Sequence, residues 1–485
     1  VQDLEIYGDL TANANMGWDL SLSATTIFYG DANQFVDFKA LTMNQTIEFD
    51  GTGTFNITSP IITNRNITVL SGNIELLDSI HILNSNYGVL LYEDTFNTNN
   101  NTIRAGYLGI APFALSTDST VVDLGSSSLY LDKYVTNTIY SYFYSQLYIG
   151  AANKSTHIKD ATIFLNGSSL NKLITDKPKV DIGNLYITRG VNAYISTTEA
   201  SFDSVFFDNS GNSFWGSVNN SNKDSVDFIQ CNSSTLWLGH NLSASDYRYF
   251  SGFVKTCNTN NLRVQSRYNN ANHISKPNID VLTTNGYLNS SIYSILNINH
   301  ADVGTFASIS GSTTDMSYFK YCSVGGDFTS RYRLTFDTLV LSKEGASTTH
   351  SLSNGDTLFI NDSFSLSSNG CFIANLGSRL AGTSAFISMP AGKSFDTDFI
   401  NLKDITAIGG GSFNAGANTS NLGNNSGWTY NGSTYTLSLA YNYACISSSG
   451  STEVKVIPDG PATNFWWKST IAPYDTFNTN IDTVM

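Results

Sequence analysis

The chain has 485 residues, 13% of them charged, which is about half of the usual share in soluble proteins, and its formal net charge is −14. Its 25 Lys and Arg residues are scattered, so we expect no basic patch for nucleic acid. No apolar run is long enough to predict a membrane span, and no charged and apolar leader opens the chain.

The first 35 residues contain two short apolar runs, near Leu4 and near Thr26, separated by Asn and Gly. Such a segment is typical of a cap that covers the open end of a stack of strands. We therefore predict an N-terminal cap or attachment segment over residues 1–35. The first residue, Val1 rather than Met, suggests a processed or excised polypeptide.

From residue 36 onward, short apolar or β-branched runs recur every seven to ten residues, separated by Gly, Asn, Ser, Asp or Pro. No helical period interrupts them, so short strands must bury their apolar edges by stacking turn upon turn. The pattern predicts an all-β chain, with a right-handed parallel β-helix (solenoid) over residues 36–428. A β-sandwich with antiparallel hairpins is the structural alternative.

Residues 212–278 depart from the pattern of short apolar runs and contain several aromatic residues and a long polar tract. We interpret this stretch as a loop insertion, which is where solenoids often carry a recognition surface. The predicted ligand-binding residues are Trp215, Trp237, Tyr247 and Tyr249, because aromatic side chains offer large apolar surfaces to a glycan.

Two segments further along resemble β-helical proteins of phage tail fibres, tailspikes and bacterial surface adhesins. Residues 316–324 (MSYFKYCSV) look like a β-helix rung, and residues 399–428 resemble the segment that closes such modules. The resemblance is architectural and extends over about residues 36–430. It implies a right-handed β-helix on a virion or cell surface, and it carries over no catalytic residue.

Beyond Trp428 the apolar residues alternate with polar ones, as in Thr434–Leu439. A period of two suits a half-exposed antiparallel sheet. We predict a small C-terminal β module or cap over residues 429–485. Its Phe465-Trp466-Trp467 run is expected to pack against the end of the solenoid, with contact to a glycan or a second copy as alternatives.

Five cysteines lie far apart without the spacing of a zinc site, so buried free thiols are expected. Cys231 and Cys257 are close enough in sequence to link adjacent coils in an oxidising compartment. The six His residues are dispersed, and we predict no metal site and no cofactor.

Carboxylate pairs were considered because cleavage of a glycosidic bond needs two of them. The candidates are Asp176 with Asp181, Asp203 with Asp208, and Asp224 with Asp227, each of which is more simply a turn or strand-edge residue. A lyase would also need a base, for which Lys177, Lys179, Arg189 and Arg248 are candidates. None of these residues forms a recognisable constellation, which favours a non-catalytic protein over an enzyme.

The leading hypothesis is a non-catalytic extracellular fibre or adhesin of a virion or cell surface, with a structural role and a surface glycan or receptor as partner. A homotrimer or larger assembly is expected. The first alternative is a trimeric tailspike-like polysaccharide depolymerase, either a hydrolase or a lyase. The second is a self-assembling subunit of a surface lattice or sheath.

Overall fold

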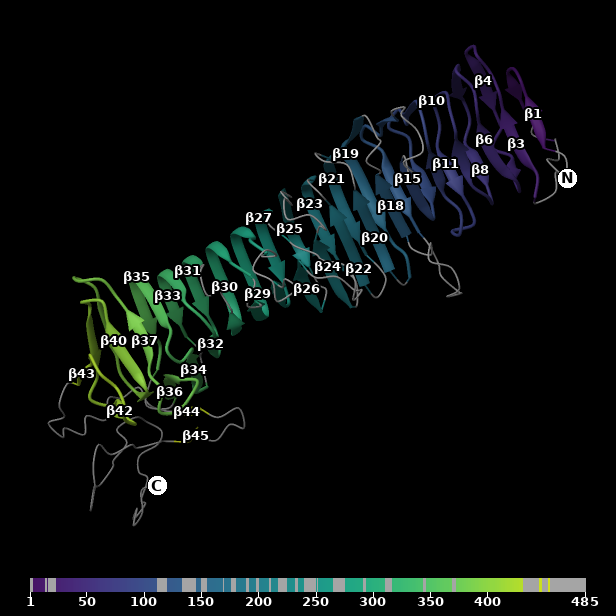
Figure 1. Cartoon of the computed structure of the whole chain (residues 1–485). Helices are drawn as coiled ribbons and strands as arrows, with labels where there is room; N and C mark the ends of the chain where they lie inside the picture. Colours follow the sequence, from purple (N-terminus) through teal and green to yellow (C-terminus); the bar gives the residue numbers. More distant parts are fainter. Residues whose placement is uncertain are drawn as a thin grey trace, which may run out of the picture. The chain divides into compact units, whose positions relative to one another are not determined.

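The fold is taken from a computed structural model (Figure 1). The structure describes residues 3–13, 15, 23–110, 120–132, 145–149, 155–168, 170–175, 180–188, 192–197, 200–208, 211–216, 225–231, 234–239, 250, 252–264, 275–290, 294–309, 316–342, 346–368, 372–430, 445–446 and 452–453. The described residues form strands and turns without a helix. Nothing in them is a helix of the length and apolar character that a membrane span requires.

The chain divides into two compact units, which are described separately. Unit 1 comprises residues 1–304 and 308–320, and unit 2 comprises residues 305–307 and 321–485. Strands β30 (Asn297–Ile309) and β31 (Ser317–Val324) contribute residues to both.

Unit 1 is built from short strands that pair in parallel with strands of the next coil. Its strands are β1 (Leu4–Ile6), β2 (Leu10–Thr11), β3 (Thr25–Phe28), β4 (Gln34–Asp37), β5 (Thr42–Met43), β6 (Thr46–Phe49), β7 (Thr54–Ile57), β8 (Ile61–Thr63), β9 (Ile67–Val69), β10 (Asn73–Leu76), β11 (Ile80–Ile82), β12 (Val89–Leu91), β13 (Thr95–Asn97), β14 (Ile103–Ala105), β15 (Tyr107–Ile110), β16 (Val121–Asp123), β17 (Ser128–Leu131), β18 (Ser145–Ile149), β19 (Ser155–Leu165), β20 (Leu170–Thr175), β21 (Val180–Ile187), β22 (Asn192–Thr197), β23 (Ala200–Phe207), β24 (Asn212–Gly216), β25 (Ser225–Cys231), β26 (Thr235–Leu238), β27 (Phe253–Thr259), β28 (Leu262–Val264) and β29 (Asn278–Ser290).

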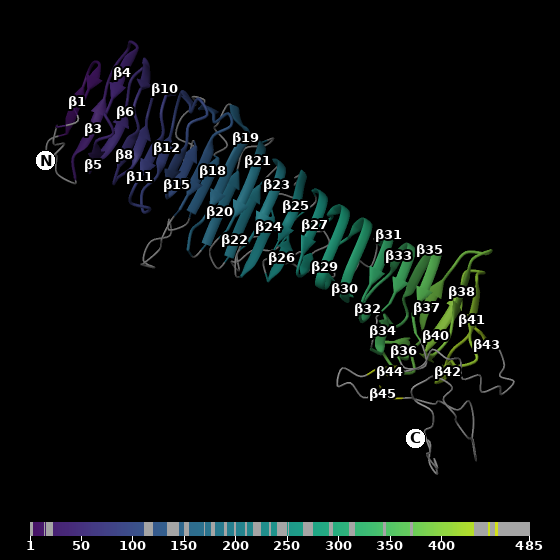
Figure 2. The same ribbon diagram turned by 180° about the vertical axis from the view of Figure 1, so that it is seen from behind.

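From β3 to β16 each strand pairs with the third strand after it, as β6 does with β9, β7 with β10 and β8 with β11. From β17 to β27 each strand pairs with the second strand after it, and many of these strands are longer. Parallel pairing between strands that are not neighbours in sequence is the arrangement of a β-solenoid, which confirms the predicted fold class. Figure 2 shows the same succession of strands from behind. The β-sandwich alternative does not fit this pairing.

The core of unit 1 consists of columns of side chains in register. Because successive residues of a strand point to opposite faces, every second residue points inward. One inner column is Phe28, Phe49, Val69, Leu91 and Ile110, all essentially inaccessible to solvent. The rings of Phe28 and Phe49 stack with their centroids 5.1 Å apart. The core of unit 1 is therefore a stack of apolar side chains that repeats once per coil, rather than the compact core of a globular domain.

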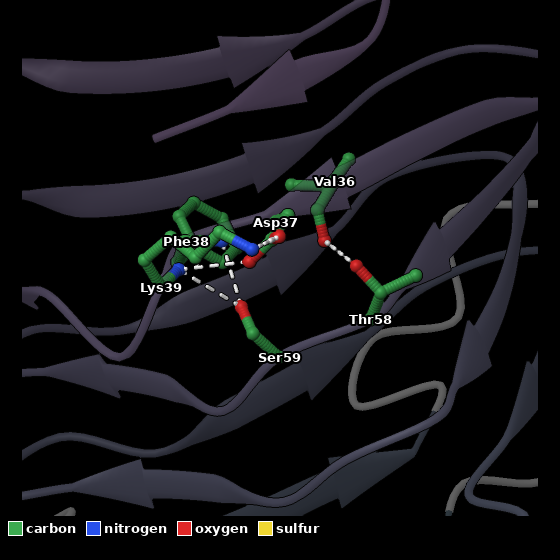
Figure 3. A network of polar contacts seen from close by, with 6 residues as sticks. All are labelled: Val36, Asp37, Phe38, Lys39, Thr58 and Ser59. Carbon is green, nitrogen blue, oxygen red and sulfur yellow. Dashed lines mark hydrogen bonds and ion pairs between the residues drawn. The ribbon is translucent and has the colours of Figure 1, made fainter. Parts of the chain in front are cut away.

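The corners between strands depend on close backbone approach and on side-chain oxygen atoms. Gly72 has φ of +97°, and a Cβ atom there would lie 2.6 Å from the carbonyl oxygen of Gly51 in the preceding coil, so only glycine fits. In the corner of Figure 3, the Ser59 hydroxyl accepts hydrogen bonds from the backbone N–H groups of Phe38 (2.7 Å) and Lys39 (3.1 Å). The Lys39 side chain is paired with Asp37 and lowers the pKa of its carboxyl.

Unit 2 continues the parallel pattern. Its strands are β32 (Phe328–Ser330), β33 (Leu334–Leu341), β34 (Thr348–Leu352), β35 (Thr357–Leu366), β36 (Ala374–Ser378), β37 (Ala385–Ser388), β38 (Ser394–Thr397), β39 (Ile400–Lys403), β40 (Ile405–Ile408), β41 (Ser412–Ala415), β42 (Ser420–Asn421), β43 (Thr429–Tyr430), β44 (Cys445–Ile446) and β45 (Thr452–Glu453). Strands β38, β41 and β43 form a separate three-stranded parallel sheet. Trp428 packs on Phe413, with ring centroids 5.4 Å apart, and its indole N–H donates to the carbonyl of Ile405 (3.2 Å).

Parallel pairing begins with β1 and β2, inside the segment predicted as a cap over residues 1–35. Strands β24 to β28 likewise lie inside the predicted loop insertion at 212–278, where they alternate with segments outside the described residues. Most of the predicted C-terminal module, including Phe465-Trp466-Trp467, also lies outside them. Of its three described strands, β43 pairs in parallel with β41, and β44 and β45 pair antiparallel.

Three of the five cysteines, Cys231, Cys257 and Cys322, are buried free thiols, as predicted. The conceivable link between Cys231 and Cys257 is therefore not formed. Burial raises the pKa of the Cys257 thiol well above its usual range, so it stays protonated and behaves as a small apolar side chain.

Candidate functional site: outward columns of unit 1

Trp215 is a core residue. It lies on β24 in the inner column between Ile195 and Leu238, and its side chain is fully buried. The ring meets Phe202 edge-on, with centroids 4.8 Å apart. A fully buried ring offers no surface to a ligand, so Trp215 has no place in a binding surface of this structure.

Trp237 lies on β26 in the neighbouring column, which points outward. Its register partners are Phe214 on one side and Arg263 on the other. The Trp237 side chain is half-buried, between the buried Leu236 and Leu238. It is therefore the one predicted ligand-binding residue that the structure both describes and leaves accessible; Tyr247 and Tyr249 lie outside the described residues.

Arg263 sits between two aromatic rings. Its Cζ atom lies 4.7 Å from the centroid of the Trp237 ring and 5.2 Å from that of Tyr287, which belongs to β29. A guanidinium over a ring face is attracted by the ring quadrupole, by about 0.5–2 kcal/mol depending on burial. We call Trp237, Arg263 and Tyr287 the arginine clamp.

The position of Tyr287 in the arginine clamp is fixed by hydrogen bonds across the coils. Its backbone N–H donates to the side-chain oxygen of Asn261 (2.9 Å), and the Asn261 amide in turn donates to the carbonyl of Ser234 (2.7 Å). The Tyr287 hydroxyl lies 3.4 Å from that of Thr235. Because Thr235 and Tyr287 are two coils apart, the Tyr287 side chain spans the coil that carries Arg263.

The guanidinium of Arg263 has unused hydrogen-bonding capacity. Its Nε is enclosed and has no acceptor. Its two Nη atoms are not enclosed, and they form no hydrogen bond or ion pair with the described residues. Arginine carries five N–H donors in a planar fork that matches an oxyanion. The clamp thus holds a fixed positive group whose open edge has no partner within the described part of the chain.

A second outward feature, which we call the aromatic ladder, runs through four coils on β17, β19, β21 and β23. The rings of Tyr130, Phe164, Tyr186 and Phe206 are in register and stack successively, with centroid separations of 4.7, 5.0 and 4.5 Å. The interplanar angles are 3°, 20° and 4°. All four side chains are partly exposed.

The stacking geometry determines what the aromatic ladder can contact. Each ring face is turned toward the neighbouring ring, and the outer face of Tyr130 lies under Arg104, whose Cζ atom is 5.1 Å from the ring centroid. Arg104 also lies 3.9 Å from a carboxylate oxygen of Asp132. The faces of Tyr130, Phe164 and Tyr186 are therefore occupied, which suits stabilisation of the coils better than stacking of a sugar on these rings.

Neither feature was identified from the sequence, although a signal for the ladder exists. Its four strands share the order polar, aliphatic, aromatic, apolar: SLYL at 128–131, TIFL at 162–165, NLYI at 184–187 and SVFF at 204–207. In a solenoid this order places one aromatic ring outward per coil. The arginine clamp has no comparable signal, because Tyr287 reaches it from a position that is not in register with Arg263.

The carboxylates considered for catalysis do not form a site among the described residues. Asp181 accepts a hydrogen bond from the hydroxyl of Ser201 in the next coil. Asp203 and Asp208 are exposed. The side chains of Asp176, Asp224 and Asp227 are not described, nor are the candidate bases Lys177, Lys179, Arg189 and Arg248. Within the described ranges, no three His, Cys, Asp or Glu side chains come together in a way that could hold a metal ion.

Comparisons with known proteins identify no relative: no family model, no curated protein and no solved structure matches the chain. Arguments about function therefore depend on the geometry of this chain alone.

Proposed function

We propose that the chain is a non-catalytic β-solenoid of a virion or cell surface, which combines a structural role with binding of a surface glycan or receptor. The observation that carries the proposal is the arginine clamp, an accessible cluster of aromatic and polar groups held on strands of consecutive coils. Binding sites for sugars combine apolar faces with a few placed polar groups. The exposed part of the half-buried Trp237 ring supplies apolar surface, and Arg263 supplies a polar group.

The scaffold of unit 1 suits an extracellular surface because uncharged side chains form its interior columns. Apolar columns fill the interior of unit 1, and partly exposed side chains of successive coils support one another, as in the aromatic ladder. A low share of charged residues fits the same setting. A homotrimer or larger assembly remains a prediction of this proposal.

Replacement of Trp237 by Ala tests the proposal. On a glycan array, the wild-type chain is expected to bind a defined set of glycans. The Trp237→Ala variant is expected to lose at least about tenfold in affinity, because the half-buried ring supplies both contact area and one side of the clamp. Binding is read by array fluorescence and confirmed by calorimetry with the best glycan.

Tyr7→Ala is the matched control, since Tyr7 is an aromatic residue of the first coil of unit 1 with 71% of its surface exposed. Its loss should leave binding within about twofold of wild type. A silent array, or unchanged binding by Trp237→Ala with an intact fold by circular dichroism, would contradict the proposed function.

A further inference from the structure

We infer that the arginine clamp binds the carboxylate of an acidic sugar, so that the ligand is a carboxylated glycan of the uronic or sialic type. This inference rests on the proposed function and narrows it to one class of ligand. Its basis is that Arg263, unlike the other described arginines that lie over rings in unit 1, has no hydrogen-bond acceptor or carboxylate among the described residues.

Unit 1 has three described arginines over aromatic rings, and Arg263 differs from the other two. Arg65 lies over Tyr87 at 4.8 Å and also donates a hydrogen bond to the Tyr87 hydroxyl. Arg104 lies over Tyr130 and is close to Asp132. Arg263 contacts two rings and no acceptor among the described residues. Arg263 is therefore held by two rings and keeps N–H donors that have no acceptor among the described residues, so they are available to an anionic ligand.

The two rings also restrict the orientation of the guanidinium. The Trp237 and Tyr287 rings lie 4.7 and 5.2 Å from its Cζ atom and restrict approach from their sides, while the Nη edge has no partner among the described residues. A carboxylate that meets this edge forms two parallel N–H···O bonds in one plane, which are shorter and stronger than bonds between neutral groups. Since the rings already fix the side chain, little conformational entropy is lost on binding.

A neighbouring polar group completes the recognition of a sugar. Asn289 is the register partner of Arg263 in the next coil, on the same outward column. Adjacent strands lie about 4.8 Å apart, so its partly exposed amide is within reach of a hydroxyl on a sugar whose carboxylate is bound at Arg263. Trp237 on the other side has Arg263 over its ring, so only the exposed part of this half-buried ring is open to the sugar.

The charge of the whole chain increases the selectivity of this site. With 39 acidic and 25 basic residues, the chain repels a polyanion over much of its surface. Screening limits this repulsion to about 8–10 Å at physiological salt. An acidic glycan is therefore retained only where a positive group is free to pair with it, and Arg263 provides such a group.

The test uses the full chain and an array that presents polygalacturonate, a glucuronate-containing polymer and a sialylated oligosaccharide, each beside its carboxyl-reduced form. Dextran sulfate beside dextran separates carboxylate from sulfate recognition. The variants are Arg263→Gln, which removes the charge, and Arg263→Lys, which keeps the charge and loses the planar fork. Arg65→Gln is the matched control, because it removes one arginine from over a ring elsewhere in unit 1.

We expect wild type to bind at least one carboxylated glycan and to lose at least about tenfold in affinity when its carboxyls are reduced. Arg263→Gln should lose a similar factor, and Arg263→Lys should fall between the two. Arg65→Gln should stay within about twofold of wild type. Thermal unfolding midpoints close to that of wild type confirm that the variants are folded.

Four outcomes overturn the inference. Carboxylate recognition is excluded by equal binding of the carboxylated and reduced forms, or by unchanged binding by Arg263→Gln. If Trp237→Ala still abolishes binding in either case, the proposed function stands. Tighter binding of dextran sulfate than of every carboxylated glycan would show that the clamp recognises a sulfate instead of a carboxylate. Absence of binding to any glycan overturns the inference and the proposed function together.

Discussion

At the scale of single residues, His350 of unit 2 shows what burial of an ionisable group does in this fold. It lies on β34 in register with the buried Phe328 and Leu376. Its Nε2 is 2.8 Å from the hydroxyl of Thr348, and its Nδ1 is enclosed without a partner. Burial lowers the pKa of His350 from 6.5 to about 4, and the charge of Asp327 opposes this only in part.

The shift predicts a pH dependence of stability. Between pH 6.5 and about 4 the unfolded chain binds a proton that the folded chain does not, so the contribution of His350 is full above pH 6.5 and is lost as the pH falls toward 4. The total loss is on the order of 3 kcal/mol. In His350→Leu, which has no ionisable group there, the decline of the thermal midpoint between pH 7 and pH 4 should be smaller.

Scanning calorimetry at several pH values measures this difference. His300→Leu, which removes a partly exposed imidazole that lies 3.0 Å from Asp302, controls for the loss of a histidine as such. If His350→Leu and wild type lose the same stability over this interval, the buried neutral imidazole is not the cause.

At the scale of elements, the outward columns determine how strands of unit 1 support one another. Tyr186 has a stacked ring on each side, at 5.0 Å from Phe164 and at 4.5 Å from Phe206. Aromatic pairs contribute about 0.5–1.5 kcal/mol each beyond their buried area. The aromatic ladder therefore joins four coils on the outside as the inner columns do on the inside.

Replacing Tyr186 by Ser removes two of these contacts and should destabilise unit 1 by about 1–3 kcal/mol. Glycan binding should be unchanged, since both faces of the Tyr186 ring are already occupied. Tyr7→Ser, which removes a ring stacked only on Tyr29, should cost less. The comparison is made by hydrogen exchange of strands β19 to β23; equal protection in Tyr186→Ser and wild type would show that the ladder does not stabilise the coils.

The same scale explains what the sequence could and could not predict. Short strands with frequent turn residues predicted the solenoid. Burial of every second residue and glycines at the corners both produce patterns that can be recognised within a few residues of sequence. The choice between Trp215 and Trp237 requires the register, and coil length varies: Ile47 pairs with Ile67, whereas Arg263 pairs with Asn289. Two tryptophans of similar local pattern thus lie on opposite faces, and only the pairing of strands distinguishes them.

At the scale of the whole molecule, the protein is a parallel β-solenoid for which we propose one binding site on its outer surface. The interior of unit 1 is filled by apolar columns, the ladder supports several coils, and the arginine clamp combines a half-buried ring with a guanidinium that has no hydrogen-bond acceptor among the described residues. We therefore propose that ligand binds at the clamp, in which Trp237 and Arg263 belong to the predicted recognition stretch 212–278 and Tyr287 lies beyond it.

Footprinting of the full chain by a photochemically generated carbene, with and without the best glycan from the array, tests this placement most directly. The account predicts reduced labelling of Trp237, Tyr287 and their strand neighbours in the bound state, with labelling of Tyr130 to Phe206 unchanged. Reduced labelling confined to other strands, or no change at saturating glycan, would contradict it.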